Sequence, residues 1–497
     1  MDYGKLRNGS DIRGVALEGV AGQSVTLDQS AVEHIARGFL RWLRQQQGEG
    51  KRLRIAVGRD SRISGPDVAR WLDGALALGG ADVTDMGLCT TPAMFMTTVT
   101  EGYLFDGAVM ITASHLPWNR NGLKFFTARG GAESEDIKEI LALGEAPLRA
   151  VHTGSVVSGD FMDAYAAILR EKICAAAGKD RPLEGYKIVV DAGNGAGGFF
   201  ADKVLAPLGA DTSGSRYLEP DGRFPNHVPN PELPEAMDSI RAAVLESGAD
   251  FGIIFDTDVD RAGAVLKSGE ELNRNRLIAL ISAILLREHP GTAIVTDSIT
   301  STGLADFIAR HGGVHRRFRR GYRNVINEAL RLNALGQDCQ LAIETSGHAA
   351  MKENYFLDDG AYLVTKFLIE LACGRELEGL VRDLSEPAES REFRMPIIAE
   401  DFRAAGQAVL NALEAAVPVQ PGWTMAPDNF EGVRVNLDKK HGNGWFLLRL
   451  SLHDPILPLN IESDSPGGVR RIALELVPFL AEQRGVDAAP LTDFLLP

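Results

Sequence analysis

The chain has 497 residues and carries 52 Lys and Arg against 67 Asp and Glu, which gives a formal net charge of −15. That balance argues against binding to nucleic acid or to acidic membranes through a basic surface. Four cysteines without a CxxC pair argue against a zinc ribbon or a disulfide scaffold and favour a reducing compartment. The polar start and the absence of a long apolar run predict a cytoplasmic protein without a signal peptide or membrane span.

Short apolar runs that end in small or polar residues predict buried strands at 54–58, 107–112, 187–191, 251–255, 292–296 and 340–343. Helical spacing of apolar residues lies between them, at 28–47, 66–79, 237–246 and 304–310. Strand, polar loop and helix in repetition predict an α/β fold with parallel or mixed sheets. In such sheets, functional groups lie on loops that leave the carboxyl ends of strands.

The chain is predicted to form four domains. A polar stretch at 152–160 separates a first α/β unit from a helix near residue 161, and a turn at 267–271 opens a third unit. The stretch 385–394 is predicted to be a linker, followed by a β-richer pattern with strands at 432–436 and 444–448. We expect three α/β domains at 1–155, 156–265 and 266–390 and a smaller α+β domain at 391–497.

The segment from Thr112 to Phe125 combines a strand end, an exposed Ser114 and His115, and Lys124 on the next extended piece. A serine at such a place can carry a phosphoryl group if a cation neutralises it and a neighbour handles the proton. An ordinary polar loop explains these residues equally well when they are considered alone.

The segment from Phe255 to Arg261 follows another buried strand and contains Asp256, Asp258 and Asp260. Alternate residues of an extended backbone point the same way, so the three carboxylates are expected to converge. Because uncompensated carboxylates repel one another, a divalent cation such as Mg²⁺ is the economical explanation. An EF-hand is disfavoured because Arg261 occupies the sixth loop position, where a glycine is needed. A solvated acidic loop is the alternative.

Two further loops could bind a phosphorylated sugar. Glu344, Ser346 and His348 follow a strand and offer groups that bond vicinal hydroxyls, although a plain turn with a surface histidine is the more economical reading in isolation. Arg449 and Ser451 leave a later strand and could hold a phosphate. The GxGxxG stretch 193–198 follows a strand as well, but we interpret it as a tight turn rather than a nucleotide site.

Taken in order, these loops resemble the α-D-phosphohexomutase superfamily, which includes phosphomannomutase/phosphoglucomutase and phosphoglucosamine mutase. The resemblance covers nearly the whole chain. The matching segments are 8–14 (NGSDIRG), 112–117 (TASHLP), 256–261 (DTDVDR), 344–348 (ETSGH) and the connection at 221–231. Each segment is moderately specific, and their shared order makes the resemblance strong.

The resemblance implies four domains around a cleft and an exchange of hexose 1-phosphate and 6-phosphate through a hexose 1,6-bisphosphate, which also serves as activator. It implies that Ser114 carries the phosphoryl group, and that Mg²⁺ is held by Asp256, Asp258, Asp260 and the phosphate on Ser114. Arg13, His115, Lys124 and His348 would then act as catalytic groups. The implied substrate-binding residues are Ser10, Arg261, Arg320, Gly321, Tyr322, Glu344, Thr345, Ser346, Gly347, His348, Arg449, Ser451 and His453.

Several residues depart from the family pattern and bear on the choice of sugar. Leu452 and His453 stand where the family commonly has glycine and threonine, and Leu116 stands where it has asparagine. Ile299 replaces a lysine, and Tyr322 replaces a histidine. Ser10 also stands where mannose and glucose enzymes often carry tyrosine.

The leading hypothesis is a mannose or glucose phosphohexomutase, either monomeric or dimeric. The alternatives are a phosphoglucosamine mutase, a sugar-phosphate-binding protein without turnover, and a magnesium phosphatase that uses Asp256 as its nucleophile.

Overall fold

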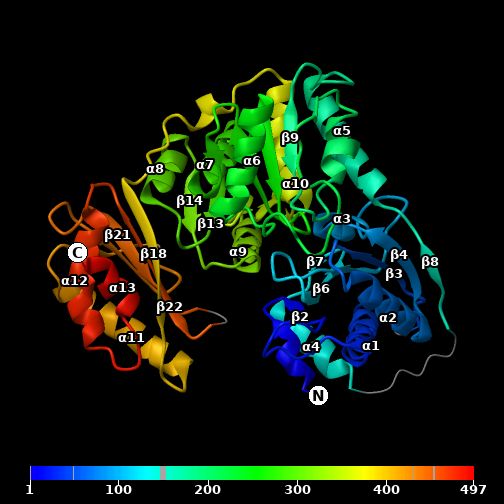
Figure 1. Ribbon diagram of the computed structural model, residues 1–497, viewed down its shortest axis with the longest axis horizontal. Coiled ribbons are helices and arrows are strands. Elements are labelled where there is room, and N and C mark those ends of the chain that lie inside the picture. Colours follow the sequence, from blue (N-terminus) through cyan, green and yellow to red (C-terminus); the bar gives the residue numbers. More distant parts are fainter. Residues whose placement is uncertain (1, 49, 146–152, 428, 452–453, 497) are drawn as a thin grey trace. The chain divides into compact units, whose positions relative to one another are not determined.

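The computed structural model describes residues 2–48, 50–145, 153–427, 429–451 and 454–496 (Figure 1). The chain divides into two compact units. The first comprises Met1–Ile284 and Ser346–Leu380, and the second comprises Leu285–Thr345 and Val381–Pro497. Among the described residues, no helix has the length and apolar character needed to cross a membrane.

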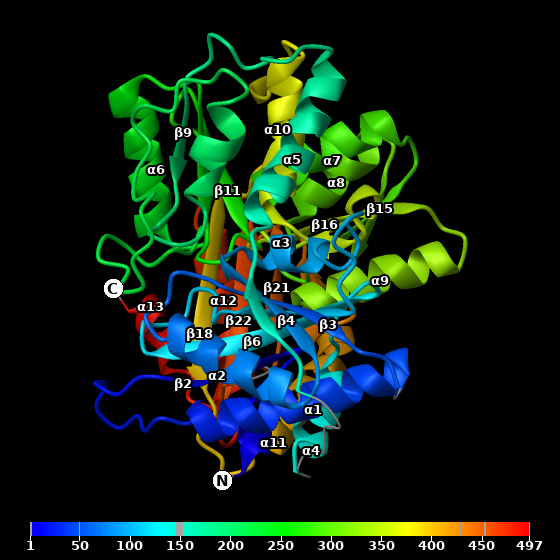
Figure 2. The ribbon, with the colours of Figure 1, turned by 90° about the vertical axis from the view of Figure 1, so that its right-hand side faces the viewer.

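The first unit begins with a mixed sheet in the order β1-β2-β6-β5-β3-β4-β8, with β7 paired to β6. Helix α2 packs on β3 and β4, and α1 packs on α2 and α4 (Figure 2). The strands are β1 (Arg7–Asn8), β2 (Asp11–Val15), β3 (Arg54–Arg59), β4 (Asp82–Leu88), β5 (Gly107–Ile111), β6 (Arg120–Thr127), β7 (Gly130–Gly131) and β8 (Val156–Ser158). The helices are α1 (Gln29–Gln47), α2 (Gly65–Leu78), α3 (Thr91–Met96) and α4 (Ser134–Leu143).

A second sheet of this unit has the order β12-β11-β10-β9, in which β9 and β10 are parallel. Its central strand β10 is fully buried, as its unbroken apolar sequence predicts. The elements are β9 (Ile188–Asp191), β10 (Phe251–Phe255), β11 (Ala262–Leu266), β12 (Glu271–Leu272), α5 (Met162–Ala177), α6 (Pro234–Ser247) and α10 (Gly360–Ala372). The unit also contains β16 (Ala349–Met351) and β17 (Leu357–Asp358), which pair with each other in antiparallel fashion outside this sheet. Helix α7 (Arg274–Glu288) crosses the division between the units.

The glycine-rich stretch after β9 is a tight turn, as interpreted from the sequence. Gly193 and Asn194 have φ values of 52° and 60°. A Cβ on Gly195 would lie 2.6 Å from the Thr257 carbonyl oxygen, and a Cβ on Gly198 would lie 2.3 Å from that of Leu218. The glycines therefore allow the turn to pack directly against the loop that follows β10.

The second unit contains a parallel sheet and an antiparallel sheet. Strands β13 (Ala293–Thr296), β14 (Val314–Arg317) and β15 (Cys339–Ile343) pair in parallel, accompanied by α8 (Thr302–Arg310) and α9 (Tyr322–Ala334). The antiparallel sheet has the order β18-β22-β21-β20-β19. Its elements are β18 (Glu389–Pro396), β19 (Trp423–Met425), β20 (Val433–Leu437), β21 (Gly444–Leu448), β22 (Ile456–Ser463), α11 (Phe402–Ala416), α12 (Gly468–Ala481) and α13 (Ala489–Leu495).

The predicted fold class is confirmed: three mixed or parallel sheets with flanking helices precede an antiparallel sheet with its own helices. The predicted linker at 385–394 is wrong in its second half, because strand β18 begins at Glu389 and pairs with β22. The polar stretch at 152–160 contains β8, which pairs with β4. The turn at 267–271 lies within the second sheet, because β12 pairs with β11.

Candidate active site

The loop after β5 holds Ser114 in an unusual backbone conformation. Its φ is 49°, in the left-handed region that residues with a Cβ rarely adopt. The Ser114 N–H donates to Thr112 Oγ1 at 2.9 Å. The Ser114 hydroxyl donates to Asp256 Oδ2 at 3.0 Å and accepts from Arg261 Nη2 at 2.9 Å. This buried hydroxyl therefore lies between a carboxylate and a guanidinium.

Three carboxylates from the loop after β10 converge on one place. Asp256, Asp258 and Asp260 are buried, and oxygens from all three lie within 4.8 Å of one another. The expected convergence is present, but the expected cause is wrong. The loop is a turn rather than an extended segment, and Val259 has a φ of 66°. It is the turn that brings the carboxylates together.

Lys124 on β6 is the main cation beside these carboxylates. Its Nζ donates to Asp258 Oδ2 at 3.0 Å and also to Asp260 Oδ2. Thr91 donates its hydroxyl to Asp258 Oδ2 at 2.5 Å. The Oδ1 atoms of Asp258 and Asp260 are buried and accept no hydrogen bond from the described residues. A cluster of carboxylate oxygens with such unused acceptors fits a hard divalent cation such as Mg²⁺.

The charges in this cluster shift its proton affinities in opposite directions. Burial, together with the charges of Asp260 and Asp258, raises the pKa of Asp256 well above its usual range. Burial also acts to raise the pKa of Asp260, but Lys124, His348 and Arg261 outweigh it and lower that pKa. Asp260 therefore keeps its negative charge beside Lys124, whereas the charged form of Asp256 is disfavoured.

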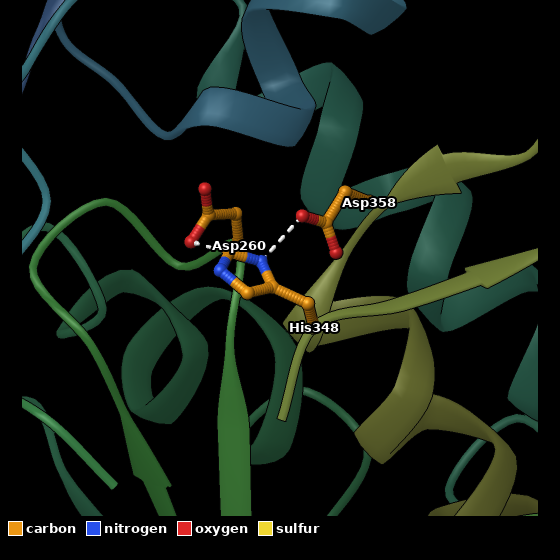
Figure 3. Close-up of side chains that lie close together, drawn as sticks. All are labelled: Asp260, His348 and Asp358. Carbon is orange, nitrogen blue, oxygen red and sulfur yellow. Dashed lines mark hydrogen bonds and ion pairs between the residues drawn. The ribbon is translucent and has the colours of Figure 1, made fainter. Parts of the chain in front are cut away.

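His348 joins a second acidic pair beside this cluster (Figure 3). Its Nδ1 lies 2.5 Å from Asp358 Oδ2 and 3.8 Å from Asp260 Oδ1. Burial lowers the pKa of His348, but Asp358 and Asp260 outweigh burial and raise it to about 9. The backbones of His348 and Arg261 also pair as an isolated antiparallel bridge. The imidazole is therefore oriented by Asp358.

His115 has the opposite electrostatic environment. Its Nδ1 lies 2.7 Å from Arg261 Nη2 and 3.4 Å from Ser114 Oγ. Burial and the positive charges of Arg261 and Arg13 lower the pKa of His115 to about 2. His115 is therefore neutral at neutral pH, where it can accept a hydrogen bond but is a weak base. Arg13 lies on β2 and pairs with Asp11 at 3.0 Å.

The predicted sugar loop is divided between the two units, after Thr345. In the second unit, Gly321 N–H donates to Glu344 Oε1 at 2.6 Å. The Thr345 hydroxyl donates to Asp297 Oδ2 at 2.8 Å, and Arg320 Nε lies 3.9 Å from the same carboxyl oxygen. These groups form a polar cluster of their own at the ends of β13 and β15.

The remaining predicted residues occupy separate positions. Ser346 and Gly347 belong to the first unit, where the buried Ser346 hydroxyl has no hydrogen-bond partner among the described residues. Ser10 lies in the turn between β1 and β2, and Tyr322 opens α9. Arg449 and Ser451 follow β21, and burial lowers the pKa of Arg449. His453 lies outside the described residues.

Sequence reasoning missed several side chains that support the site. Asp358 orients His348, Thr91 bonds Asp258, and Asp297 anchors the loop that contains Thr345. Arg62 binds the loop of Ser114 through backbone carbonyls. Polar residues directly after β3 were the available indication for Arg62, since the same rule identified Ser114 and Asp256.

Known proteins are similar to this chain in sequence and fold. Three domain families match in order, described as phosphoglucomutase/phosphomannomutase, alpha/beta/alpha domain I at residues 4–146, domain II at 126–269 and domain III at 273–388. A phosphomannomutase/phosphoglucomutase of Pseudomonas putida is 32% identical over 430 residues, covering 86% of this chain and 86% of that protein. A phosphoglucomutase of Neisseria gonorrhoeae is 30% identical over 459 residues, with 92% and 93% covered.

The chain belongs to the phosphoglucomutase/phosphomannomutase family. The crystal structure of a phosphoglucomutase/phosphomannomutase family protein from Burkholderia thailandensis has a TM-score of 0.79 and 26% identity. It covers 97% of this chain and 98% of its own. Membership of the family thus extends over nearly the full length, including the antiparallel sheet that follows the three matched domains.

Proposed function

We propose that this protein is a phosphohexomutase that interconverts hexose 1-phosphate and hexose 6-phosphate, with mannose or glucose as the sugar. The main observation in support of this proposal is that the Ser114 hydroxyl lies between Asp256 and Arg261, beside a buried carboxylate cluster. Relatives at about 30% identity named phosphoglucomutase or phosphomannomutase support an isomerase of this class.

In the proposed reaction, Ser114 carries a phosphoryl group in the resting enzyme and passes it to a sugar hydroxyl. The product of that step is a hexose 1,6-bisphosphate, which returns its other phosphoryl group to Ser114. Each transfer breaks one P–O bond and forms another, and the proton lost by the attacking hydroxyl ends on the oxygen from which the phosphoryl group departs. Most catalysis of such transfers is positioning and charge stabilisation.

The residues of the first unit fit these tasks. Arg261 already contacts Ser114 Oγ and would stabilise charge on the transferred group. His115 is neutral and can accept a hydrogen bond from Arg261, while His348 is oriented by Asp358 and could hold a proton. Lys124 would orient the reacting groups beside the carboxylates. Mg²⁺ bound by Asp256, Asp258 and Asp260 would supply further neutralisation of the phosphoryl oxygens.

The residues of the second unit are proposed to recognise the substrate. Glu344 and Thr345, with Ser346 and His348, would bond sugar hydroxyls that glucose and mannose share. Arg449 and Ser451 would hold the phosphate that is not being transferred, and Arg320, Gly321, Tyr322 and His453 would also bind the substrate. In the first unit, Ser10 is a further proposed substrate-binding residue and Arg13 a proposed catalytic residue. This assignment rests on the family resemblance and on the local cluster around Asp297.

Phosphorus NMR tests the proposal directly. Glucose, mannose and glucosamine 1-phosphates are each incubated with the protein, Mg²⁺ and a trace of the matching 1,6-bisphosphate. Conversion to a 6-phosphate establishes the mutase, and the relative rates choose among the sugars. A folded protein that converts none of them contradicts the proposal and favours a binding protein.

The variant Ser114→Ala separates the mutase from a magnesium phosphatase. We expect it to lose turnover and to accept no phosphoryl group from labelled bisphosphate, since the proposed acceptor oxygen is gone. Ser213→Ala, in an exposed turn, is the matched control. Label retained on an aspartate in Ser114→Ala would instead support a phosphatase that uses Asp256.

A further inference from the structure

Arg62 is bound to four backbone carbonyls of the loop that contains Ser114. Its Nη1 donates to the carbonyl oxygens of Pro117 at 2.9 Å and Arg120 at 3.0 Å. Its Nη2 donates to the carbonyl oxygens of Leu116 at 2.7 Å and of Ser114 itself. The side chain is 1% exposed. One guanidinium thus holds the loop from Ser114 to Arg120 along its whole length.

Asp60 fixes the orientation of this guanidinium from the other side. Its Oδ2 lies 3.3 Å from Arg62 Nε, and its Oδ1 accepts a hydrogen bond from the backbone N–H of Arg62 at 2.9 Å. Asp60 is 2% exposed. A buried charge pair is costly unless its hydrogen bonds are satisfied. The four loop carbonyls satisfy Nη1 and Nη2 of Arg62, while Nε lies beside Asp60 without a hydrogen bond among the described residues.

The connection at 221–224 covers Arg62 from the part of the first unit that carries the second sheet. A Cβ on Gly222 would lie 2.5 Å from both the Ser61 carbonyl oxygen and the Ile63 nitrogen. The Phe224 ring centroid lies 5.3 Å from the Arg62 guanidinium carbon. This close cover excludes water from the hydrogen bonds and strengthens them.

We propose that Arg62 is a positioning residue for Ser114. Arg62 does not contact the Ser114 hydroxyl. It binds the carbonyl of a residue whose φ of 49° is unfavourable without such support, and so aims the hydroxyl at Asp256 and Arg261. The proposal rests on the proposed role of Ser114 as the phosphoryl carrier.

The geometry requires a guanidinium rather than any cation. Arginine presents five N–H donors in a rigid planar fork, whereas lysine presents three donors at one point. A lysine at this position keeps the charge opposite Asp60 but cannot reach four carbonyls spread from Ser114 to Arg120. Arg62→Lys therefore removes most of the hydrogen bonds that shape the Ser114 loop while retaining the ion pair with Asp60.

Three measurements on Arg62→Lys test the inference. We expect kcat to fall by about 100-fold, the loss that a displacement of about 1 Å in a reacting group can cause, while KM changes by less than about threefold. Single-turnover transfer of labelled phosphoryl from glucose 1,6-bisphosphate to Ser114 should slow by the same factor. Amide hydrogen exchange should accelerate in the peptide 112–121, with other peptides unchanged.

Arg41→Lys is the matched control. Arg41 on α1 also donates to a backbone carbonyl, that of Leu143 at 2.5 Å, at the end of α4. We expect normal kcat and normal exchange at 112–121 in this variant. If Arg62→Lys fails to fold, Asp60→Asn provides a second variant. It leaves the Arg62 guanidinium able to bond the four carbonyls but removes the charge that orients it. We expect a smaller loss in kcat and faster exchange at 112–121.

The outcomes separate failure of the inference from failure of the proposed function. A wild type that neither accepts the labelled phosphoryl group nor converts substrate defeats the proposed function. In that case the exchange measurement still tests whether Arg62 shapes the loop that contains Ser114. Unchanged kcat and unchanged exchange at 112–121 in Arg62→Lys overturn the inference. Faster exchange throughout the first unit, with kcat per folded molecule unchanged, overturns it in favour of a purely structural role.

Discussion

At the scale of single residues, the balance of charge around Ser114 decides what the site can hold. Asp256, Asp258 and Asp260 bring three carboxylates to one place, against the cations Lys124 and Arg261. Arg261 is directed to Ser114 and Asp256, while Lys124 covers one oxygen each of the other two carboxylates. In the part of the chain that the structure describes, the remaining oxygens of Asp258 and Asp260 lie buried without hydrogen bonds. An added cation would relieve both their desolvation and their mutual repulsion.

Asp258→Asn should remove most activity without unfolding the protein. The substitution keeps the shape of the side chain and lowers the repulsion within the cluster, but it replaces a carboxylate by a weak ligand for a hard cation. We expect the affinity for Mg²⁺ to fall at least about tenfold, with a Tm equal to or above that of the wild type. Calorimetric titration with Mg²⁺ and a thermal melt measure the two effects.

Asp238→Asn, on the exposed face of α6, serves as the control for this prediction. Near-normal turnover of Asp258→Asn without added Mg²⁺ would refute the metal assignment. A large fall in its Tm would show that Asp258 supports the fold rather than a metal.

At the scale of elements, the sequence predicted the buried strands and the loops at their ends. The runs that became β5 and β10 are fully buried, so their apolar residues are unbroken and local sequence suffices. Strand β8 is exposed throughout, and β18 has no buried residue in its first half and only two, Phe393 and Met395, in its second half, so neither produces such a run. The position of Arg62 after β3 indicated a functional loop, but its partners could not be predicted, because they lie more than 50 residues along the chain and are backbone atoms.

Gly195→Ala should damage the metal site through the turn that follows β9. The new Cβ would lie 2.6 Å from the Thr257 carbonyl oxygen, and Ala196 N–H donates to that same oxygen at 2.8 Å. Thr257 lies between Asp256 and Asp258, so relief of the clash displaces two carboxylates. We expect the dissociation constant for Mg²⁺ to rise about tenfold or more, measured by calorimetry.

Gly74→Ala is the control for this glycine substitution, because a Cβ there meets nothing within 4 Å and the residue lies inside α2. It should stabilise the protein by about 0.5–1 kcal/mol and leave metal affinity unchanged. Equal metal affinities in Gly195→Ala and wild type would show that the turn does not position the carboxylates.

Asp73 makes the packing of α2 sensitive to pH. Its carboxyl is 5% exposed, and burial, with the charge of Asp85, raises its pKa to about 7. An unfolded aspartate has a pKa of about 3.9, so the folded state binds this proton more tightly. The stability that this proton contributes is therefore fully present below about pH 4 and is lost as the pH rises through 7. Asp73→Asn, which stays neutral, should be more stable than wild type at pH 8.

We expect this advantage to grow by about 1–3 kcal/mol between pH 4 and pH 8, which corresponds to a Tm difference of several degrees. Thermal melts of both proteins at pH 4.5, 6 and 8 measure it. Asp67→Asn, exposed on the same helix, should show no such trend. A Tm difference that does not change with pH would contradict the raised pKa of Asp73.

At the scale of the whole molecule, the chain divides its proposed tasks between two compact units. The first contains Ser114, the carboxylate cluster and His348, and the second contains Glu344, Arg320 and Arg449. The division falls within the loop at 344–348, between Thr345 and Ser346. Chemistry and recognition of the second phosphate are therefore proposed to depend on different parts of the chain, and single changes should separate kcat from KM.

Arg449→Ala tests this separation. Its proposed partner is the phosphate that does not react, so the variant should raise KM for glucose 1-phosphate by about 10-fold or more, the value of one charge-assisted hydrogen bond, with a smaller change in kcat. Steady-state kinetics measure both. Arg394→Ala, on the exposed part of β18, is the control. An unchanged KM would remove Arg449 from the substrate site.

Binding of Mg²⁺ should stabilise only the first unit, because all three carboxylates belong to it. A ligand at 100 times its dissociation constant stabilises the state that binds it by about 2.7 kcal/mol. Hydrogen exchange with and without Mg²⁺ should therefore show protection in peptides that cover β5, β10 and the loop Asp256–Arg261, with none in β20 to β22. Asp258→Asn should abolish the protection. Equal protection in both units would show that the metal binds elsewhere or that the two units unfold as one.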